Sequence, residues 1–192
     1  MQQSKYPKFL EGTKVYLRPI EKEDASYYYR SLYEPLGRRL TGTQKIYTEE
    51  QIERYLESSS SNSSRVHLLI TLQETDETIG DIAVQDIDPT NRNANIRIAL
   101  YEERHQGFGY GSEAMRLLLD YAFGVLQLHR VELNVFSYNE RAVRAYEKVG
   151  FKVEGRQREA LYYNYEYHDS ILMAILAREY VEKYKNRVDR GG

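Results

Sequence analysis

The chain has 192 residues, 41% of them hydrophobic and 29% charged, and its 27 basic and 29 acidic side chains give a net charge of −2. This size and composition fit one domain with its own hydrophobic core, and the charge balance excludes a globally basic nucleic-acid-binding protein. Because the sequence contains no cysteine, it has no disulfide scaffold, no cysteine-ligated zinc site and no thiol nucleophile.

The sequence pattern predicts blocks of strands and helices along the chain. Strands are expected over residues 13–19, 66–72, 78–87, 94–101, 131–136, 151–160 and 166–176. Helices are expected over residues 22–34, 48–56 and 110–125, and between the capping residue Asn139 and the helix-ending Gly150. Thr48 and Gln51 have the spacing of a capping box at the start of the second helix.

The order of these elements predicts the fold class. Short polar connections between residues 66 and 101 indicate an antiparallel meander, and the later strand–helix–strand alternation adds a parallel crossover. We therefore expect a single α/β (α+β) domain, with a mixed, mostly antiparallel central sheet and helices on both faces. The domain should span residues 12–176, between an N-terminal tail (1–11) and a peripheral, helical C-terminal tail (177–192).

No signal for export or membrane insertion is present. The N-terminal segment lacks the apolar run of a signal peptide, and the sequence has no stretch of 18 apolar residues. We therefore expect a cytoplasmic protein that binds neither membranes nor nucleic acid. His67, His129 and His168 show no spacing typical of metal ligation, so no metal is expected.

The most informative segment is residues 104–112 (RHQGFGYGS), between a predicted strand and a predicted helix. Its glycines let the backbone turn sharply and leave its amides open to a ligand. The free N–H groups of the first helical turn favour an anion, and a pyrophosphate fits best. A glycine-rich turn without a ligand explains the same pattern. The sequence Gly111-Ser112-Glu113 excludes a P-loop, and the G-x-G-x-G spacing after a meander argues against a dinucleotide fold.

The loop and the following helix together resemble a known family. Gln106-x-x-Gly109-x-Gly111, followed by Asn139-x-x-Ala142-x-x-x-Tyr146-x-x-x-Gly150-Phe151, is similar to the GCN5-related N-acetyltransferase (GNAT) superfamily. The finer pattern resembles its ribosomal-protein and spermidine N-acetyltransferase branch. That pattern comprises Tyr16-Leu17-Arg18-Pro19, Tyr146-Glu147-Lys148-Val149-Gly150-Phe151, Arg158-Glu159-Ala160 and Asp169-Ser170-Ile171-Leu172-Met173. The similarity covers residues 12–176.

The resemblance implies acetyl-CoA as cosubstrate and direct acetyl transfer to an amine. In the family, loop amides hold the pyrophosphate, the strand before the loop pairs with the pantetheine arm, and a tyrosine of the next helix protonates the leaving thiolate. The positions that match the cofactor site are Ile98, Ala99, Leu100, Gln106, Gly107, Phe108, Gly109, Tyr110, Gly111, Ser112 and Asn139. Tyr146 matches the proton donor, and the Leu100 N–H is the expected donor to the oxyanion.

Two of these residues also have simpler interpretations. Tyr146 shares a predicted helix face with Val143 and Val149, as a core tyrosine would. Asn139 has the position of a plain N-cap. Without the resemblance the simpler interpretations are favoured; with it, the functional roles are.

The general base is not indicated by the pattern. Many relatives in this branch have Glu at the position of Asn95, and an asparagine side chain accepts no proton at neutral pH. Glu34, Glu102, Glu103 and His105 are the available alternatives, and for each of them the interpretation as a solvated surface residue is favoured. A chain of water molecules to bulk solvent would also serve.

The resemblance leaves the acceptor open among a polyamine or other small amine, a protein N-terminus and an amine-bearing antibiotic. Relatives often have Gly at the position of Tyr165, so the hairpin at the lip of the acceptor site should be reshaped, with Asn164 in the left-handed conformation. The alternative function is a non-catalytic acyl-CoA-binding sensor or interaction module, which Asn95 keeps open and Tyr146 argues against. A homodimer, formed with help from residues 178–190, is a further expectation.

Overall fold

A computed structural model describes residues 6–59 and 63–185. Its strands are β1 (Leu10–Glu11), β2 (Val15–Pro19), β3 (Val66–Leu72), β4 (Thr78–Asp88), β5 (Asn93–Leu100), β6 (Arg130–Phe136), β7 (Lys152–Tyr163) and β8 (Glu166–Leu176). Its α-helices are α1 (Ala25–Ser31), α2 (Pro35–Thr41), α3 (Glu49–Ser59), α4 (Tyr110–Gly124), α5 (Glu140–Val149) and α6 (Ala177–Tyr184). Short 3₁₀ turns lie at Lys22–Asp24 and Glu103–His105.

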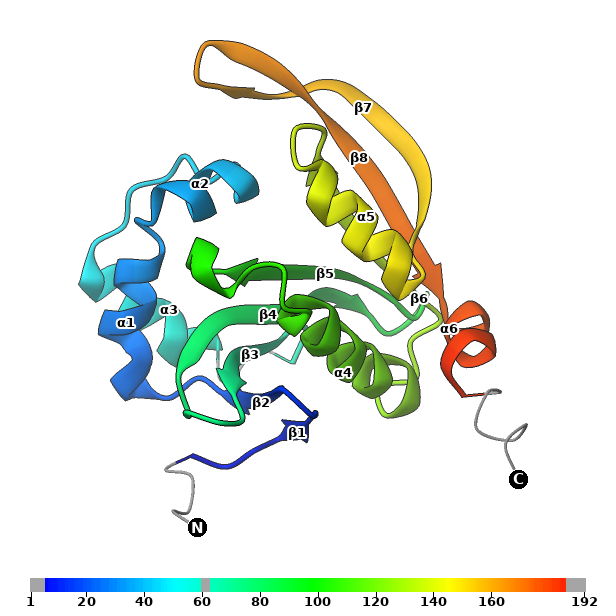
Figure 1. Ribbon diagram of the computed structural model, residues 1–192, viewed down its shortest axis with the longest axis horizontal. Coiled ribbons are helices and arrows are strands. Elements are labelled where there is room, and N and C mark those ends of the chain that lie inside the picture. The colour runs from blue at the N-terminus through cyan, green and yellow to red at the C-terminus, as the bar shows by residue number, and fades with distance from the viewer. Residues whose placement is uncertain (1–5, 60–62, 186–192) are drawn as a thin grey trace.

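The strands form one eight-stranded sheet in the order β1-β2-β3-β4-β5-β6-β8-β7 (Figure 1). Every neighbouring pair is antiparallel except β5 and β6, which are parallel and joined through α4. The mixed, mostly antiparallel sheet with helices on both faces confirms the predicted fold class. Among the described residues, no helix has the length and apolar character needed to span a bilayer.

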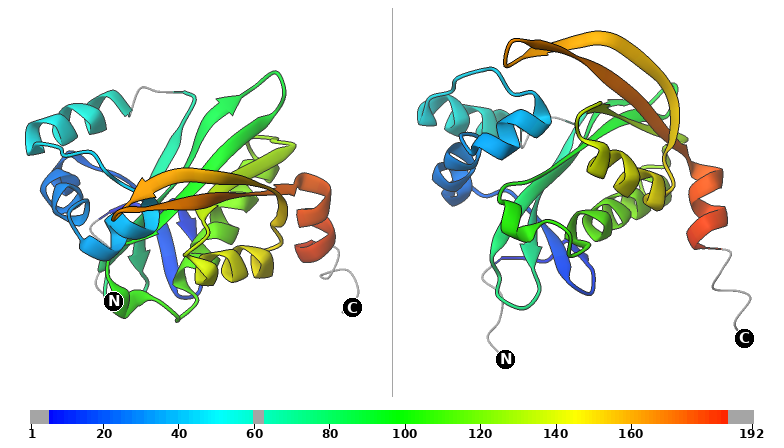
Figure 2. Two further views of the ribbon diagram at one scale, coloured as in Figure 1. Left: turned by 90° about the horizontal axis from the view of Figure 1, so that it is seen from above. Right: turned by 45° about the horizontal axis from the view of Figure 1, so that its top comes forward.

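Two hydrophobic clusters hold the helices to the two faces of the sheet. The larger one packs α4 and α5 against the sheet, with Ile96, Leu118 and Val131 in its interior. The smaller one, with Tyr28, Ile52 and Tyr101 at its centre, joins α1 and α3 to the opposite face. Figure 2 shows α1–α3 gathered apart from α4 and α5, with the β7–β8 hairpin arching between the two groups.

The sheet extends into the segment that we expected to be an N-terminal tail. Leu10–Glu11 pairs with β2, and the buried Glu113 carboxylate of α4 accepts hydrogen bonds from the backbone N–H groups of Thr13 and Lys14. The short hairpin is thus tied to α4 by a contact 100 residues away in sequence.

The C-terminal segment is helical from Ala177 to Tyr184, but it is not peripheral. Tyr180 is 2% exposed in the larger cluster, and its hydroxyl donates to the Arg116 carbonyl oxygen. Residues 186–190 of the expected dimer segment lie outside the described residues.

The pattern did not predict α2, which follows α1 after a short turn. Proline at its first position and Gly42 as its left-handed C-cap (φ +65°) delimit this helix. It has no fully buried residue, so it lacks the apolar period that marks longer helices. Two contacts hold it over the sheet: the Tyr138 hydroxyl donates to the Arg39 carbonyl oxygen, and Gln44, just beyond it, donates to the Tyr162 carbonyl oxygen.

Candidate functional site

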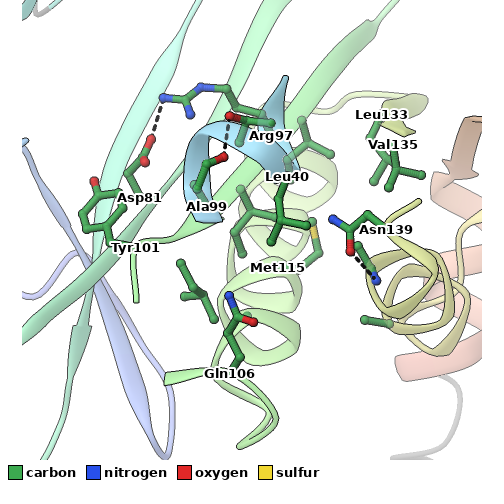
Figure 3. A pocket seen from close by; sticks show the side chains of 18 of the residues that line it. Leu40, Asp81, Arg97, Ala99, Tyr101, Gln106, Met115, Leu133, Val135 and Asn139 are labelled. Carbon is green, nitrogen blue, oxygen red and sulfur yellow. Dashed lines mark hydrogen bonds and ion pairs between the residues drawn. The ribbon is translucent and has the colours of Figure 1, made fainter. Parts of the chain in front are cut away.

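A cavity of about 1180 Å³ is lined by residues from the helices on both faces of the sheet. Side chains from α1, α2 and α3 line one end, and the 105–112 loop with α4 and α5 lines the other. Strands β5 and β6 form the walls between them. Figure 3 shows Asp81, Arg97 and Tyr101 on one side of this space and Leu133, Val135 and Asn139 across from them.

The cavity exists because β5 and β6 separate. Their parallel pairing covers Asn93, Ala94 and Asn95 and then stops, although β5 continues to Leu100 and β6 to Phe136. Beyond Asn95 the edge of β5 therefore faces the cavity instead of a neighbouring strand. An unpaired strand edge is a template for an extended ligand.

The hydrogen-bond alternation of β5 identifies the groups on this edge. The Tyr101 N–H donates to the Ile79 carbonyl oxygen of β4, so Ala99, two residues earlier, also directs its backbone groups toward β4. The intervening residues, Ile98 and Leu100, consequently direct their N–H and C=O groups toward the gap. Gly80 allows this packing, because a Cβ there would lie 2.2 Å from the Ala99 carbonyl oxygen.

The glycine loop forms an open cradle of amides at the start of α4. Gly107 (φ +89°) and Gly109 (φ +85°) adopt the left-handed backbone that glycine tolerates best. The described residues supply no hydrogen-bond acceptor to the N–H groups of residues 107–112. Lys14 lies beside the cradle and donates to the Phe108 carbonyl oxygen at 2.9 Å. Free amides, a helix N-terminus and a nearby cation suit a diphosphate.

Helix α5 forms the opposite wall. Asn139 is its N-cap, since its side chain accepts a hydrogen bond from the Ala142 N–H at 3.2 Å, and it also lines the cavity. Tyr146, two turns later, lines the cavity while its ring packs near Phe151, with 6.1 Å between ring centroids. Burial raises the pKa of Tyr146 to about 12, which keeps its hydroxyl protonated at neutral pH.

The structure brings nearly all of the predicted site residues to this cavity. Ile98, Ala99, Leu100, Gln106, Gly107, Gly109, Tyr110, Gly111, Ser112, Asn139 and Tyr146 line it. Phe108 does not: its side chain is 59% exposed and stacks on the ring of Tyr110. Only the main chain of Phe108 can therefore belong to the cradle.

The candidate bases are placed differently from one another. Asn95 lines the cavity, whereas Glu34, Glu102 and Glu103 do not. His105 is not the solvated surface residue that its sequence context favours: it is 5% exposed and lines the cavity, with its Nε2 atom 3.5 Å from a Glu77 carboxylate oxygen. Within the part of the chain that the structure describes, no group of three His, Asp or Glu side chains is arranged to hold a metal ion.

The sequence reasoning missed a buried polar cluster at the α1–α3 end of the cavity. The Asp81 carboxylate accepts hydrogen bonds from Arg97 (2.5 Å) and from His67 (2.7 Å), and Arg97 also contacts the Tyr28 hydroxyl (3.2 Å). Burial opposes the ionisation of Asp81, but the Arg97 charge and the His67 hydrogen bond outweigh it and lower its pKa to about 2. The sequence signal that could have found this cluster is the presence of charged residues, Asp81 and Arg97, within predicted strands.

His67 remains neutral in this cluster. Burial lowers the pKa of its imidazole, the charges of Arg97 and Arg65 act in the same direction, and the contact with Asp81 compensates only in part. Arg97 keeps its charge, because the attraction of Asp81 raises the pKa of its guanidinium against the effect of burial. The cluster is therefore an ion pair between Arg97 and Asp81, to which the neutral side chains of His67 and Tyr28 are hydrogen-bonded.

Comparison with known proteins places the chain among acetyltransferases. A family model described as "Acetyltransferase (GNAT) domain" matches residues 14–152. The spermidine N(1)-acetyltransferase of Escherichia coli K12 is 30% identical over 175 residues, which cover 89% of this chain and 90% of that protein. The fold matches the spermidine N-acetyltransferase from Vibrio cholerae in complex with CoA and spermine (TM-score 0.83, 24% identity), over 88% of this chain and 99% of the other. It also matches a dodecameric structure of the Vibrio cholerae enzyme (TM-score 0.78, 23% identity), over 90% and 99%.

Proposed function

Because the chain belongs to the GNAT acetyltransferase family, it is an acetyl-CoA-dependent N-acetyltransferase, and we propose that it acetylates the primary amine of a small molecule directly in the cavity between β5 and β6. The observation that carries this proposal is the end of the β5–β6 pairing at Asn95. The end of this pairing leaves a free strand edge between the amide cradle at one end of the cavity and the α1–α3 residues at the other end.

The amide cradle is the proposed site for the CoA diphosphate. The free N–H groups of residues 107–112 supply the donors, and Arg141, which donates to the Gln106 side chain, adds positive charge at the cavity wall. The edge groups of Ile98 and Leu100 would pair with the amides of the pantetheine arm. Acetyl-CoA supplies the thioester, which is the activated acyl group of the reaction.

Two groups then act on the reacting atoms in this proposal. The Leu100 N–H, directed into the gap, stabilises the negative charge that develops on the thioester oxygen. Tyr146 gives its proton to the leaving thiolate, because its hydroxyl remains protonated in the buried site. Of the candidate bases that line the cavity, Asn95 accepts no proton, Asp81 is held as an anion of low basicity, and His105 is the one imidazole among the described lining residues. The acceptor ammonium loses one proton, to His105 or through water to solvent, before its nitrogen attacks. The second proton that the nitrogen gives up as the amide forms replaces the one that Tyr146 gave to the thiolate.

The names of the relatives raise spermidine as a candidate acceptor. A polyamine carries several ammonium groups, each of which gains from a nearby carboxylate. Among the described residues that line the cavity, Asp81 is the one carboxylate, and Arg97 and His67 already bind it. We therefore place spermidine in the acceptor panel beside monoamines rather than treat it as the substrate.

The test is an acceptor screen with the full chain. We expect release of CoA thiol, and mass gain of one acetyl group on an amine, only when acetyl-CoA and the amine are both present. Calorimetry should detect CoA binding in the absence of an acceptor. If CoA binds tightly but no amine is acetylated, the proposed acetyl transfer is wrong and the non-catalytic acyl-CoA-binding sensor is favoured instead.

Self-association is the second part of the proposal. The β7–β8 hairpin exposes three tyrosines, Tyr162 (51%), Tyr165 (89%) and Tyr167 (63%), and the rings of Tyr162 and Tyr167 pack together with 5.0 Å between their centroids. Such an exposed aromatic surface is typical of a protein interface. Sedimentation should show a species larger than the monomer, and replacing Tyr162 and Tyr167 with serine should shift it toward the monomer. A wild-type chain that sediments as a monomer at all concentrations contradicts this part.

A further inference from the structure

The cavity is lined by far more positive than negative side chains. The cations are Arg38, Arg65, Arg97, Arg141, Arg144 and Lys148, whereas Asp81 is the one carboxylate among the described lining residues. The last three cations lie on α5, beside the glycine loop, where the phosphates of CoA require positive charge. The other three lie toward α1–α3, at the end left for the acceptor.

One of these acceptor-side arginines, Arg97, is paired with the carboxylate of Asp81. Asp81 is 2% exposed and neutralises the guanidinium of Arg97, to which it is hydrogen-bonded. The Arg97 side chain is nevertheless 31% exposed, so part of its guanidinium faces the cavity. Figure 3 shows the Arg97–Asp81 pair at this end, with Tyr101 nearby.

Arg65 is the second guanidinium and has no counter-ion in the described part of the chain. It lies over the Tyr55 ring, 5.3 Å from the ring centroid, and its Nε atom is buried without a hydrogen-bond acceptor. Arg65 and Arg97 together carry two positive charges against the single negative charge of Asp81, and His67 beside them is neutral. A partly buried site with excess positive charge is costly unless an anion binds there.

We infer that the acceptor carries an anionic group, a carboxylate or a phosphate, as well as its amine, and that Arg65 and Arg97 bind this group. The inference rests on the proposed acetyl transfer and names its substrate class. Guanidinium groups recognise both anions through paired N–H donors. Asp81 has a positioning role here: it holds Arg97 in place and does not touch the amine.

The geometry also limits the size of the acceptor. Arg97 and Leu100 are three residues apart on β5, which corresponds to ~10 Å along an extended strand. The anion would lie near Arg97 and the amine would reach the gap at Leu100. The amine and the anion must therefore be several bonds apart, as in a long amino acid or a phosphorylated amino sugar.

Matched acceptor pairs test this inference. The panel contains 6-aminohexanoate against 6-aminohexanamide, glucosamine 6-phosphate against glucosamine, and spermidine. We expect at least one anionic member to exceed its neutral partner in kcat/KM by about tenfold or more, mainly through a lower KM. Which of the two pairs shows this difference identifies the anion as carboxylate or phosphate.

Arg65→Gln is the main variant, because it removes a charge without leaving a carboxylate unpaired. It should lower the ratio of kcat/KM for the anionic acceptor to kcat/KM for its neutral partner about tenfold. Arg54→Gln, on the outer surface of α3 and 67% exposed, is the matched control and should leave the ratio unchanged. Arg97→Gln alone risks unfolding, so it is combined with Asp81→Asn, and this pair should lower the same ratio.

The outcomes separate the two proposals. If amines are acetylated but neutral amines or spermidine are used as well as the anionic ones, the inference is wrong and the acetyltransferase proposal stands. An anionic-to-neutral ratio that Arg65→Gln does not change also overturns the inference. If CoA binds and no amine is acetylated, both proposals fail.

Discussion

Replacing Gly107 with alanine tests the amide cradle at the point where its shape depends on glycine. The φ angle is +89°, and a Cβ added there would have no atom within 4 Å, so a steric clash adds nothing to the effect. What remains is the backbone strain of a non-glycine residue in the left-handed region, about 1–2 kcal/mol. Since 1.4 kcal/mol corresponds to a tenfold change in an equilibrium constant, CoA should bind about 5- to 30-fold more weakly.

The effect falls on binding only if the loop relaxes when CoA is absent. The assay therefore measures the dissociation constant of CoA by calorimetry and the free energy of unfolding by urea titration on the same protein. A loop that relaxes gives weaker binding at unchanged stability, and a loop held rigid gives the reverse. The strain of about 1–2 kcal/mol should therefore lower either the affinity for CoA or the free energy of unfolding by that amount.

Gly124→Ala is the matched control. Gly124 is the last residue of α4, has no positive φ and would also place a Cβ in open space. Alanine is favoured over glycine in a helix by ~0.5–1 kcal/mol, so this variant should be slightly more stable and bind CoA as the wild type does. If Gly107→Ala leaves both the dissociation constant and the stability unchanged, the loop does not act through its left-handed glycine.

Three further predictions test other parts of the structure. Tyr146→Phe should lower kcat by ~10²–10⁴-fold while CoA affinity is retained, because it removes the proposed proton donor and keeps the ring; an unchanged rate of thiol release would remove Tyr146 from the mechanism. The pKa of Asp81 falls from 3.8 to about 2 on folding, so the wild type should lose ~2 kcal/mol of stability as the pH falls from about 4 toward 2. Asp81→Asn should lack this acid dependence in urea titrations at a series of pH values, and an equal loss in both proteins would contradict the ion pair with Arg97. Tyr165→Gly should raise the free energy of unfolding by ~0.5–1 kcal/mol, because Tyr165 has a φ of +68°, whereas Asn164→Gly should change it less, since asparagine tolerates this region; equal effects would refute this reasoning.

Local sequence patterns determined most of the secondary structure. Short runs rich in apolar and β-branched residues predicted the bounds of β3 (66–72) and β8 (166–176), as expected for strands of a sheet covered on both faces. The Thr48–Gln51 capping box forms as predicted, with both reciprocal hydrogen bonds present. Asn164 adopts the left-handed turn conformation (φ +53°) that its residue type favours. In each of these cases the deciding interactions lie within a few residues of one another.

The sequence also located one half of the cavity. Glycines between a strand and a helix leave amide groups free wherever the rest of the chain lies, so the 107–112 cradle was predictable from its own residues. The two-turn spacing of Asn139 and Tyr146 likewise placed both on the cavity side of α5.

Only the tertiary structure decided where the sheet opens and what faces the opening. Leu100 has the apolar pattern of a strand whether or not β6 pairs with it, and the pairing ends at Asn95 for reasons that no local pattern carries. His67, Asp81 and Arg97 lie on three different strands, 14 to 30 residues apart, and each in isolation resembles a solvated side chain. Antiparallel pairing of β3, β4 and β5 brings them onto one face, where burial converts separate charges into an ion pair. A single sequence specifies the period of each strand, whereas the register between strands is set by packing across the whole sheet.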